Sequence, residues 1–276
     1  MFCFCLLVAM AGFAEQRPQQ GSTEGAEPTA TQIMKNAQQA FYYLGEDMKV
    51  RVTMELIARN GGKRTRVMTM LRRDREEAGD QKYFVYFHEP GDVRGMTFMT
   101  WKYPDRDDDR WIFVPAVDLV RRIAADDKHS SFVGSDFSYE DVSGRDVDDD
   151  DHTLVGQEQL DGRPCNVVQS IPRGPGAWTK RISWIDLESF LPLKEEYYDA
   201  QDELYRVFTA DEIEVVVAGE GGGSRSYPTV TRRTMENVKT GHRTTVTYDS
   251  VSYDLGLADE DFSERRMRRP PRSWFR

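Results

Sequence analysis

At 276 residues the chain is long enough for one large domain or two small ones with a substantial core. Hydrophobic residues make up 39% and charged residues 30%, a balance typical of soluble globular proteins rather than of membrane bundles or disordered chains. The formal net charge of -10 argues against nucleic acid as the main partner, because phosphate binding requires a dominant basic surface.

The N-terminal residues have the pattern of a signal peptide. The apolar run that ends at Ala14 is too short to span a bilayer as a helix, and Gly12 and Ala14 are the small residues that a signal peptidase requires. We predict a signal peptide over residues 1–14. No Lys or Arg precedes the run, so a buried N-terminal helix or strand is the alternative. Residues 15–29 lack large apolar side chains and are predicted to be a flexible linker.

The number of cysteines bears on the cellular compartment of the mature chain. Cys3 and Cys5 would leave with the signal peptide, and Cys165 would then be the only cysteine of the mature chain. One thiol forms no intramolecular disulfide, and a lone Cys in a strand-like segment is usually a small buried hydrophobe. A secreted protein without disulfides suits the bacterial envelope, and we predict a periplasmic location.

The folded part is predicted to begin with one helix. Thr31 is suited to cap its start, and Gly45 is suited to end it. Apolar residues spaced three or four positions apart lie on one face of a helix. This apolar stripe consists of Ile33, Ala37, Phe41 and Leu44.

From Met48 onward the hydrophobic period is two residues, which predicts β-strands. Residues 48–56 and 63–73 alternate in this way and are joined by a turn at 60–62. About ten or eleven strands follow one another through short turns, so sequence neighbours should pair antiparallel. Because so many strands do not stay flat, we predict a mainly β domain over residues 30–263. It should be a single strongly curved antiparallel sheet, an unclosed β-barrel, with helices covering its mouth.

No motif for catalysis or metal binding is present. The four His residues lie in separate segments without the spacing of a zinc pair, and neither a nucleophile elbow nor a phosphate loop occurs. Asp146, Asp148 and Asp150 have the spacing of a calcium loop. However, Asp151 stands where that loop needs Gly, and Gln157 stands where it needs Glu. We predict a solvated loop at this position, and for the protein no metal, no cofactor and no enzymatic activity.

The stretch FVGSDFSYEDV, residues 132–142, combines aromatic and acidic side chains. Its acids lack a nearby nucleophile and ligand spacing, so we predict a short helical turn or ordered loop, capped through Ser135 or Asp136. Phe137 and Tyr139 should pack toward the mouth of the curved sheet, and the acids that follow them should lie near water. The alternative is an envelope hydrolase that uses Asp136, Glu140 or Asp141.

The C-terminal tail, residues 264–276, is basic. It holds six Arg residues beside Trp274 and Phe275. Each basic residue near an anionic membrane contributes roughly 1 kcal/mol. The tail predicts transient contact with a membrane surface or an acidic partner, and a disordered tail is the alternative.

Three stretches carry a family resemblance: the block FVGSDFSYEDV, the block RISWIDLESFLPLKEEYYD and the closing stretch YDSVSYDLGLADEDFS. Together they resemble the outer-membrane lipoprotein-sorting protein family, the LolA-like carriers of the bacterial periplasm. The resemblance covers residues 30–263. In the first block its most telling residues are Ser135, Asp136, Phe137, Tyr139, Glu140 and Asp141. In the second block, RISWIDLESFLPLKEEYYD, they are Trp184, Asp186, Leu191, Pro192, Glu196 and Tyr198.

The resemblance implies an unclosed antiparallel barrel with helices in its mouth, an apolar cavity and no catalysis. Flexible and aromatic side chains suit such a cavity, because they shelter a chain without demanding one shape. The residues predicted to line it are Met54, Phe87, Met96, Phe98, Trp101, Trp111 and Phe113. Those predicted at its mouth are Phe41, Phe137 and Tyr139. Plain core packing is the alternative role for each lining residue.

The implied function is that of a carrier, which shelters the acyl chains of a lipoprotein or another lipid and passes them between envelope membranes. Relatives of this kind often accompany inner-membrane exporters of the resistance-nodulation-division type, so an exporter is an expected partner. The alternative is a non-catalytic module on the same fold that senses lipid or protein in the envelope. We expect a monomer.

Overall fold

The computed structural model describes residues 27–75, 79–219 and 223–275. The predicted signal peptide, 1–14, lies outside the described residues, and so does most of the predicted linker. None of the helices in the described ranges is long and apolar enough to cross a membrane.

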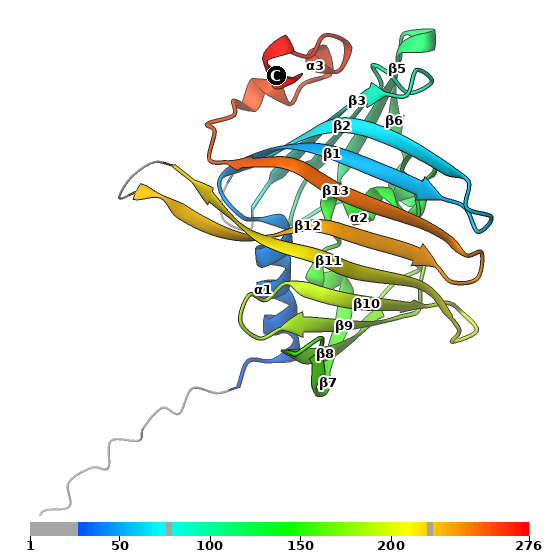
Figure 1. Cartoon of the computed structure of the whole chain (residues 1–276), viewed down its shortest axis with the longest axis vertical. Coiled ribbons are helices and arrows are strands. Elements are labelled where there is room, and N and C mark those ends of the chain that lie inside the picture. Colours follow the sequence, from blue (N-terminus) through cyan, green and yellow to red (C-terminus); the bar gives the residue numbers. More distant parts are fainter. Residues whose placement is uncertain (1–26, 76–78, 220–222, 276) are drawn as a thin grey trace, which may run out of the picture.

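The predicted fold class is confirmed: one antiparallel sheet dominates, and it does not close into a barrel (Figure 1). In the described part of the chain the sheet has 13 strands. They are β1 (Asp47–Ile57), β2 (Lys63–Asp74), β3 (Gln81–Glu89), β4 (Thr97–Lys102), β5 (Asp109–Val114), β6 (Leu119–Ile123), β7 (Asp150–Leu160), β8 (Arg163–Pro172), β9 (Lys180–Asp186), β10 (Pro192–Tyr198), β11 (Leu204–Ala218), β12 (Arg225–Asn237) and β13 (His242–Tyr253).

The strand order explains why the sheet has two free edges. It runs β6-β5-β4-β3-β2-β1-β13-β12-β11-β10-β9-β8-β7. The chain therefore zigzags from β1 out to β6, crosses to the far edge at β7, and zigzags back until β13 pairs with β1. We call residues 124–149, which make this crossing, the crossing segment. Because β6 and β7 are not neighbours, the sheet stays open between them.

The strand count exceeds the predicted ten or eleven partly because of β6, whose apolar residues show no period of two. Most of its residues are exposed, and only Ile123 is buried. Its sequence, LVRRI, pairs with β5 at the edge of the sheet, where alternation of apolar and polar side chains is not required. In contrast, β1 buries alternate residues such as Met48, Val50, Val52 and Met54, as its period of two predicts.

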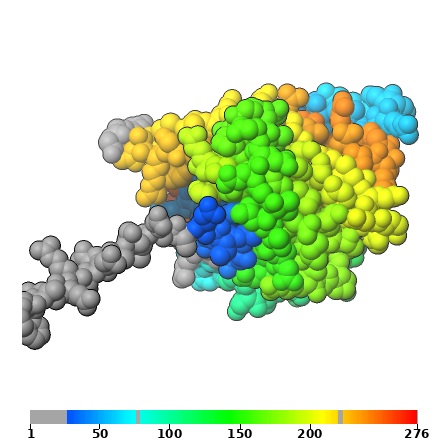
Figure 2. Space-filling model, turned by 90° about the horizontal axis from the view of Figure 1, so that it is seen from below, coloured from blue at the N-terminus to red at the C-terminus, as the bar shows by residue number. Residues whose placement is uncertain are grey.

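The helix α1 (Ala30–Tyr42) forms where its apolar stripe predicts it, but it begins earlier than expected. The side chain of Thr29, not Thr31, accepts the capping hydrogen bond from the backbone N–H of Gln32. Ile33 and Ala37 are buried. The helix contacts β7, β8 and β12, and it lies at the surface when the molecule is seen from below (Figure 2).

The crossing segment contains the short helix α2 (Tyr139–Ser143), which confirms a helical turn within residues 132–142. Its cap is Ser138, not the predicted Ser135 or Asp136. The Ser138 hydroxyl accepts from the backbone N–H of Asp141, and the Asp141 carboxylate accepts from the backbone N–H of Ser138. The helix ends at Gly144, where φ is +82° and the ring of Tyr42 lies 3.1 Å from the position of an added Cβ.

The C-terminal residues 257–275, which we call the C-terminal segment, pack against the sheet, and α3 (Glu264–Arg268) lies within them. Met267 and Trp274 are buried, and the Trp274 ring centroid lies 5.1 Å from that of Phe84 on β3. The alternative of a disordered tail is therefore wrong for residues 264–275. The exposed positions of the segment include four arginines, Arg265, Arg268, Arg269 and Arg272, and three acids, Asp259, Glu260 and Glu264.

Candidate functional site

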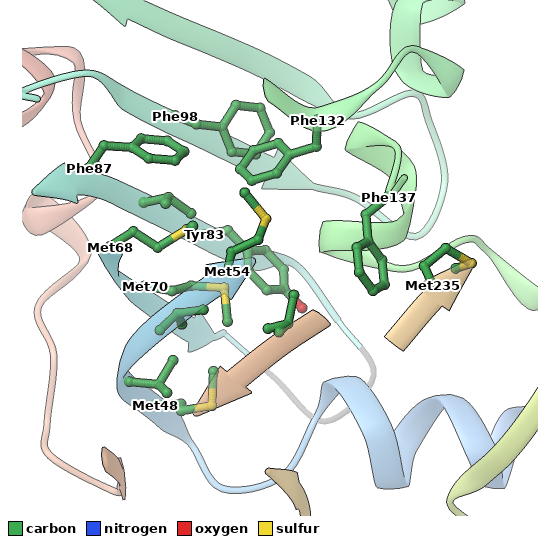
Figure 3. Close-up of a cluster of buried hydrophobic side chains, with 14 of the residues drawn as sticks. Met48, Met54, Met68, Met70, Tyr83, Phe87, Phe98, Phe132, Phe137 and Met235 are labelled. Atoms are coloured by element: carbon green, nitrogen blue, oxygen red, sulfur yellow. The ribbon is translucent and has the colours of Figure 1, made fainter. Parts of the chain in front are cut away.

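The face of the sheet that points toward α2 and the crossing segment carries a large apolar cluster, which we call the inner cluster. Its buried methionines come from β1, β2 and β12, and the crossing segment contributes aromatic rings (Figure 3). Methionine is unbranched and polarizable, so it adapts to irregular shapes. The members labelled in Figure 3 are Met48, Met54, Met68, Met70, Tyr83, Phe87, Phe98, Phe132, Phe137 and Met235.

Four of the seven residues predicted to line a cavity lie in or against the inner cluster. Met54, Phe87 and Phe98 are almost completely buried within it. Met96 is partly buried and packs against it. The structure therefore brings these four together on one face.

The structure does not bring the other three to this face. Trp101, Trp111 and Phe113 belong to a separate cluster, the outer cluster, beneath the C-terminal segment. Side chains alternate along a strand, so Trp101 on β4 must point away from Phe98, three positions earlier. On β5, Trp111 and Phe113 flank Ile112, which is the residue that joins the inner cluster. Their predicted place in the cavity lining is thus corrected.

The predicted mouth residues meet at the inner cluster. Phe137 is buried in it, and Tyr139 packs against it with its ring centroid 5.2 Å from that of Phe98. Phe41, on α1, has its ring centroid 5.9 Å from that of Phe208 on β11. Helix α1 and the crossing segment therefore cover the inner face with aromatic side chains.

Three adjoining cavities lie between the sheet and this cover. Their volumes are about 70, 30 and 40 Å³, and we call them the first, second and third cavity. Phe41 borders the first and second, Phe137 the first and third, and Met70 the second and third. Arg233 borders all three. A cavity of about 150 Å³ holds one benzene, so each of these three cavities is too small for an acyl chain in this structure.

The acids of the crossing segment hold the cover in place. Asp141 pairs with Arg206 on β11, at 2.8 Å between carboxylate and guanidinium. Asp136 Oδ2 lies 2.6 Å from His242 Nδ1 and accepts a hydrogen bond of 2.7 Å from Thr244 Oγ1. Both acids therefore bind the crossing segment to the strands of the second half of the sheet.

Glu140 is buried, which corrects the expectation that it lies near water. Burial by itself raises its pKa, but a hydrogen bond from His129 and the charges of Arg145 and Lys128 outweigh this and hold the pKa of Glu140 well below its usual range. An acid that stays ionised and paired in this way is a poor proton donor. The contacts of Glu140 are those of a structural ion pair.

The acidic run after α2 is structural as well. Asp146 caps the 3₁₀ turn Val147–Asp149, and Asp150 is buried between Arg145 and Arg181. Asp150 thereby departs from the solvated loop that was predicted. Among the described residues no group of three or more potential ligands is arranged to hold a metal ion.

The sequence interpretation missed several residues of the inner face. The methionines were identifiable from the alternation in β1 and β2, which places Met48 with Met54 and Met68 with Met70 on shared faces. No comparable signal marks Arg233 on β12, a charged residue that looks like an ordinary surface position in the sequence TVTRRTMEN.

The comparisons with known proteins agree with this architecture. A family model described as an uncharacterized protein matches residues 79–269, well over half of the chain. A search of curated proteins found no match.

Solved structures match over most of the chain. One is described as an outer membrane lipoprotein-sorting protein domain from Vibrio parahaemolyticus; it is 25% identical, with a TM-score of 0.77, and the match covers 87% of this chain and 98% of that one. A DUF1329 family protein from Desulfovibrio piger is 27% identical, with a TM-score of 0.77 and coverages of 87% and 99%. A LolA superfamily protein from Nitrosomonas europaea, 20% identical with a TM-score of 0.63 and coverages of 86% and 98%, shares the fold.

The family model begins after β2 and spans β3 to β13 together with the crossing segment. The resemblance predicted from the sequence is confirmed. The chain belongs to the outer-membrane lipoprotein-sorting family, the LolA-like proteins.

Proposed function

We propose that the protein is a periplasmic carrier, which shelters acyl chains of a lipoprotein or another lipid against the inner cluster and passes them between envelope membranes. An inner-membrane exporter is the proposed source of the cargo. The observation that carries the proposal is the combination of an adaptable, methionine-rich inner face with a cover made of α1 and the crossing segment. The family membership supports the same role.

The physical need for such a carrier is large. Each methylene group removed from water gains about 0.8 kcal/mol, so a long acyl chain exposed to water costs on the order of 10 kcal/mol. A lipid therefore does not cross an aqueous compartment unshielded. An apolar face lined by side chains without fixed shape accepts chains of different lengths.

Because the three cavities are too small for an acyl chain, cargo entry has to separate the cover from the sheet. The first cavity, of about 70 Å³, lies between Ala37 on α1 and Met235 on β12, with Phe137 beside them. An acyl chain that displaced Phe41 and Phe137 would exchange apolar contacts for apolar contacts, so the apolar contribution to the free energy of opening would be small. The ion pairs of the crossing segment provide a defined position to which the cover returns.

Native mass spectrometry of the protein purified from periplasm tests for cargo. We expect copurified lipid, released by organic solvent and identified by its mass. A protein that is consistently empty and has no affinity for added acyl chains would overturn the proposal.

A matched pair of variants tests whether the chains bind under α1. Ala37→Leu replaces a methyl by an isobutyl group beside the first cavity and should lower acyl-chain affinity, because the larger side chain occupies the space that a chain would enter. Gln32→Leu adds leucine at an exposed position of the same helix and should leave affinity unchanged. Equal affinities in both variants would contradict binding beneath α1.

A transfer assay separates carriage from sensing. Lipid-loaded protein is mixed with acceptor vesicles, and movement of the lipid into them is followed by fluorescence. Transfer supports the carrier, whereas tight binding without any transfer would favour the sensing module and count against the carrier.

A further inference from the structure

Arg233 lies at the centre of the inner face. It is on β12, beside Val246 on β13, and it borders all three cavities. Its guanidinium donates one hydrogen bond, of 2.9 Å, to the hydroxyl of Tyr248. The guanidinium carbon lies 4.7 Å from the ring centroid of Tyr248 and 5.5 Å from that of Phe41. A cation therefore faces the space that the carrier proposal assigns to a lipid.

Unlike Arg145, Arg181 and Arg206, Arg233 has no acidic partner among the described residues. Arg145 and Arg181 share Asp150, and Arg206 pairs with Asp141. Among the described residues no carboxylate lies within 4 Å of the Arg233 guanidinium. A guanidinium carries five N–H donors, and that of Arg233 has one protein acceptor. The rest of its donors are available to a ligand.

The acids that border the first cavity do not neutralise this charge. Asp141 is engaged by Arg206 and by the cap of α2. Glu195 accepts hydrogen bonds from Ser183 and Tyr197 and lies 3.5 Å from Arg181. The positive charge of Arg233 is therefore the uncompensated one at the junction of the cavities.

We propose that Arg233, together with the Tyr248 hydroxyl, binds the anionic head of a single-chain lipid whose acyl tail lies along the inner cluster. One unpaired cation fits one negative charge, as in a fatty-acid carboxylate or a phosphodiester. A planar guanidinium matches such an oxyanion through two parallel hydrogen bonds. This inference names the substrate class and rests on the proposed carrier function. A neutral acyl chain would leave the charge of Arg233 without an anionic partner in an apolar space, which is unfavourable.

The test compares ligands that have the same chain and different heads. Palmitate, hexadecanol and palmitoyl lysophosphatidylglycerol are titrated into the full chain, the two anions below their micelle concentrations and hexadecanol below its solubility limit. Displacement of a fluorescent acyl probe is the signal. The wild type should bind the two anions roughly tenfold or more tightly than hexadecanol. The stronger of the two anions identifies whether the head is a carboxylate or a phosphodiester.

Variants then assign the effect to Arg233. Arg233→Gln should weaken palmitate binding by roughly 10- to 100-fold and leave hexadecanol binding unchanged, while Arg233→Lys should retain part of the preference. The matched control is Arg232→Gln, on the exposed side of the same strand, where Arg232 lies 3.4 Å from Glu212. This control should bind every ligand as the wild type does. Circular dichroism and the Tm establish that each variant is folded.

The outcomes separate this inference from the carrier proposal. If the wild type binds hexadecanol and palmitate equally, or Arg233→Gln weakens both equally, the anion site is wrong and the carrier stands. If the wild type binds none of the three ligands, the carrier proposal fails and this inference fails with it. The comparison of ligands on the wild type decides the question even if Arg233→Gln does not fold.

Discussion

The two faces of the sheet are both apolar, but they are covered in different ways. The outer cluster is closed by the C-terminal segment, which inserts Met267 and Trp274 and stacks Phe275 on Tyr86 at 4.2 Å between ring centroids. None of its members borders the three cavities beneath the cover. Among the described buried residues the inner cluster holds five methionines and the outer cluster two, and cavities remain between the inner cluster and its cover. The C-terminal segment thus fills the outer face, whereas three cavities remain beneath the cover of the inner face.

The largest expected effect concerns the outer face. Trp274→Ala should destabilise the protein by about 3–5 kcal/mol, because it leaves a cavity next to Phe84. Urea unfolding measures the loss. Acyl-chain affinity should stay at the wild-type value, since the inner face is untouched. Arg272→Ala, at an exposed position of the same segment, is the control, and its effect should stay within about 0.5 kcal/mol. Unaltered stability of Trp274→Ala would mean that the segment does not pack here.

The next effect concerns the cover of the inner face and depends on pH. Glu140→Gln removes the acid that Arg145 and Lys128 surround, and should destabilise the protein by about 3 kcal/mol at pH 7. The pKa of Glu140 is lowered in the folded state, so its stabilising charge is fully present above the usual carboxyl value of 4.5 and is lost as the pH falls toward the folded-state pKa.

The difference in unfolding free energy between the wild type and Glu140→Gln should therefore shrink below about pH 4.5. Urea unfolding at a series of pH values measures this difference. A constant difference from pH 7 to pH 3 would contradict the ion-pair assignment.

A smaller effect is expected where the crossing segment meets β13. Asp136→Asn weakens the contacts with His242 and Thr244, and should cost about 1–2 kcal/mol. Asp249→Asn, which weakens an exposed hydrogen bond with Thr53, is the control and should cost less. If thermal unfolding showed the same loss of stability for Asp136→Asn and Asp249→Asn, the contacts of Asp136 would stabilise the protein no more than an exposed hydrogen bond does. Faster exchange of backbone amides in residues 132–143 should accompany the Asp136 change.

The smallest effect on stability belongs to the inner face itself. Met54→Leu conserves volume and should change the unfolding free energy by less than about 1.5 kcal/mol. It replaces a flexible side chain by a branched one, so binding should become more selective for chain length. Titration of acyl chains of roughly 12 to 18 carbons measures this selectivity. An unchanged affinity profile would mean that Met54 is core packing only.

Much of the fold followed from local patterns. The alternation of β1 and β2 and the stripe of α1 each state which residues share a face, and short turns require antiparallel neighbours. The short edge strand β6 was not predicted, because exposed residues at a sheet edge show no periodic pattern. The cap of α2 was misplaced by three positions or fewer, because Ser135, Asp136 and Ser138 are all suitable capping residues and the sequence alone does not rank them.

The sequence by itself determined a mainly β chain, its strand-by-strand alternation and its family resemblance. Only the tertiary structure decided which face of each strand points inward, because the central strands are apolar on both faces and a period of two assigns partners without assigning a side. Because of that ambiguity, the sequence interpretation assigned three residues of the outer cluster to the inner face: Trp101, Trp111 and Phe113. The position of Arg233 beside the cavities was not predicted for a related reason. Its surroundings, which hold no acidic partner among the described residues, are formed by residues from distant parts of the chain.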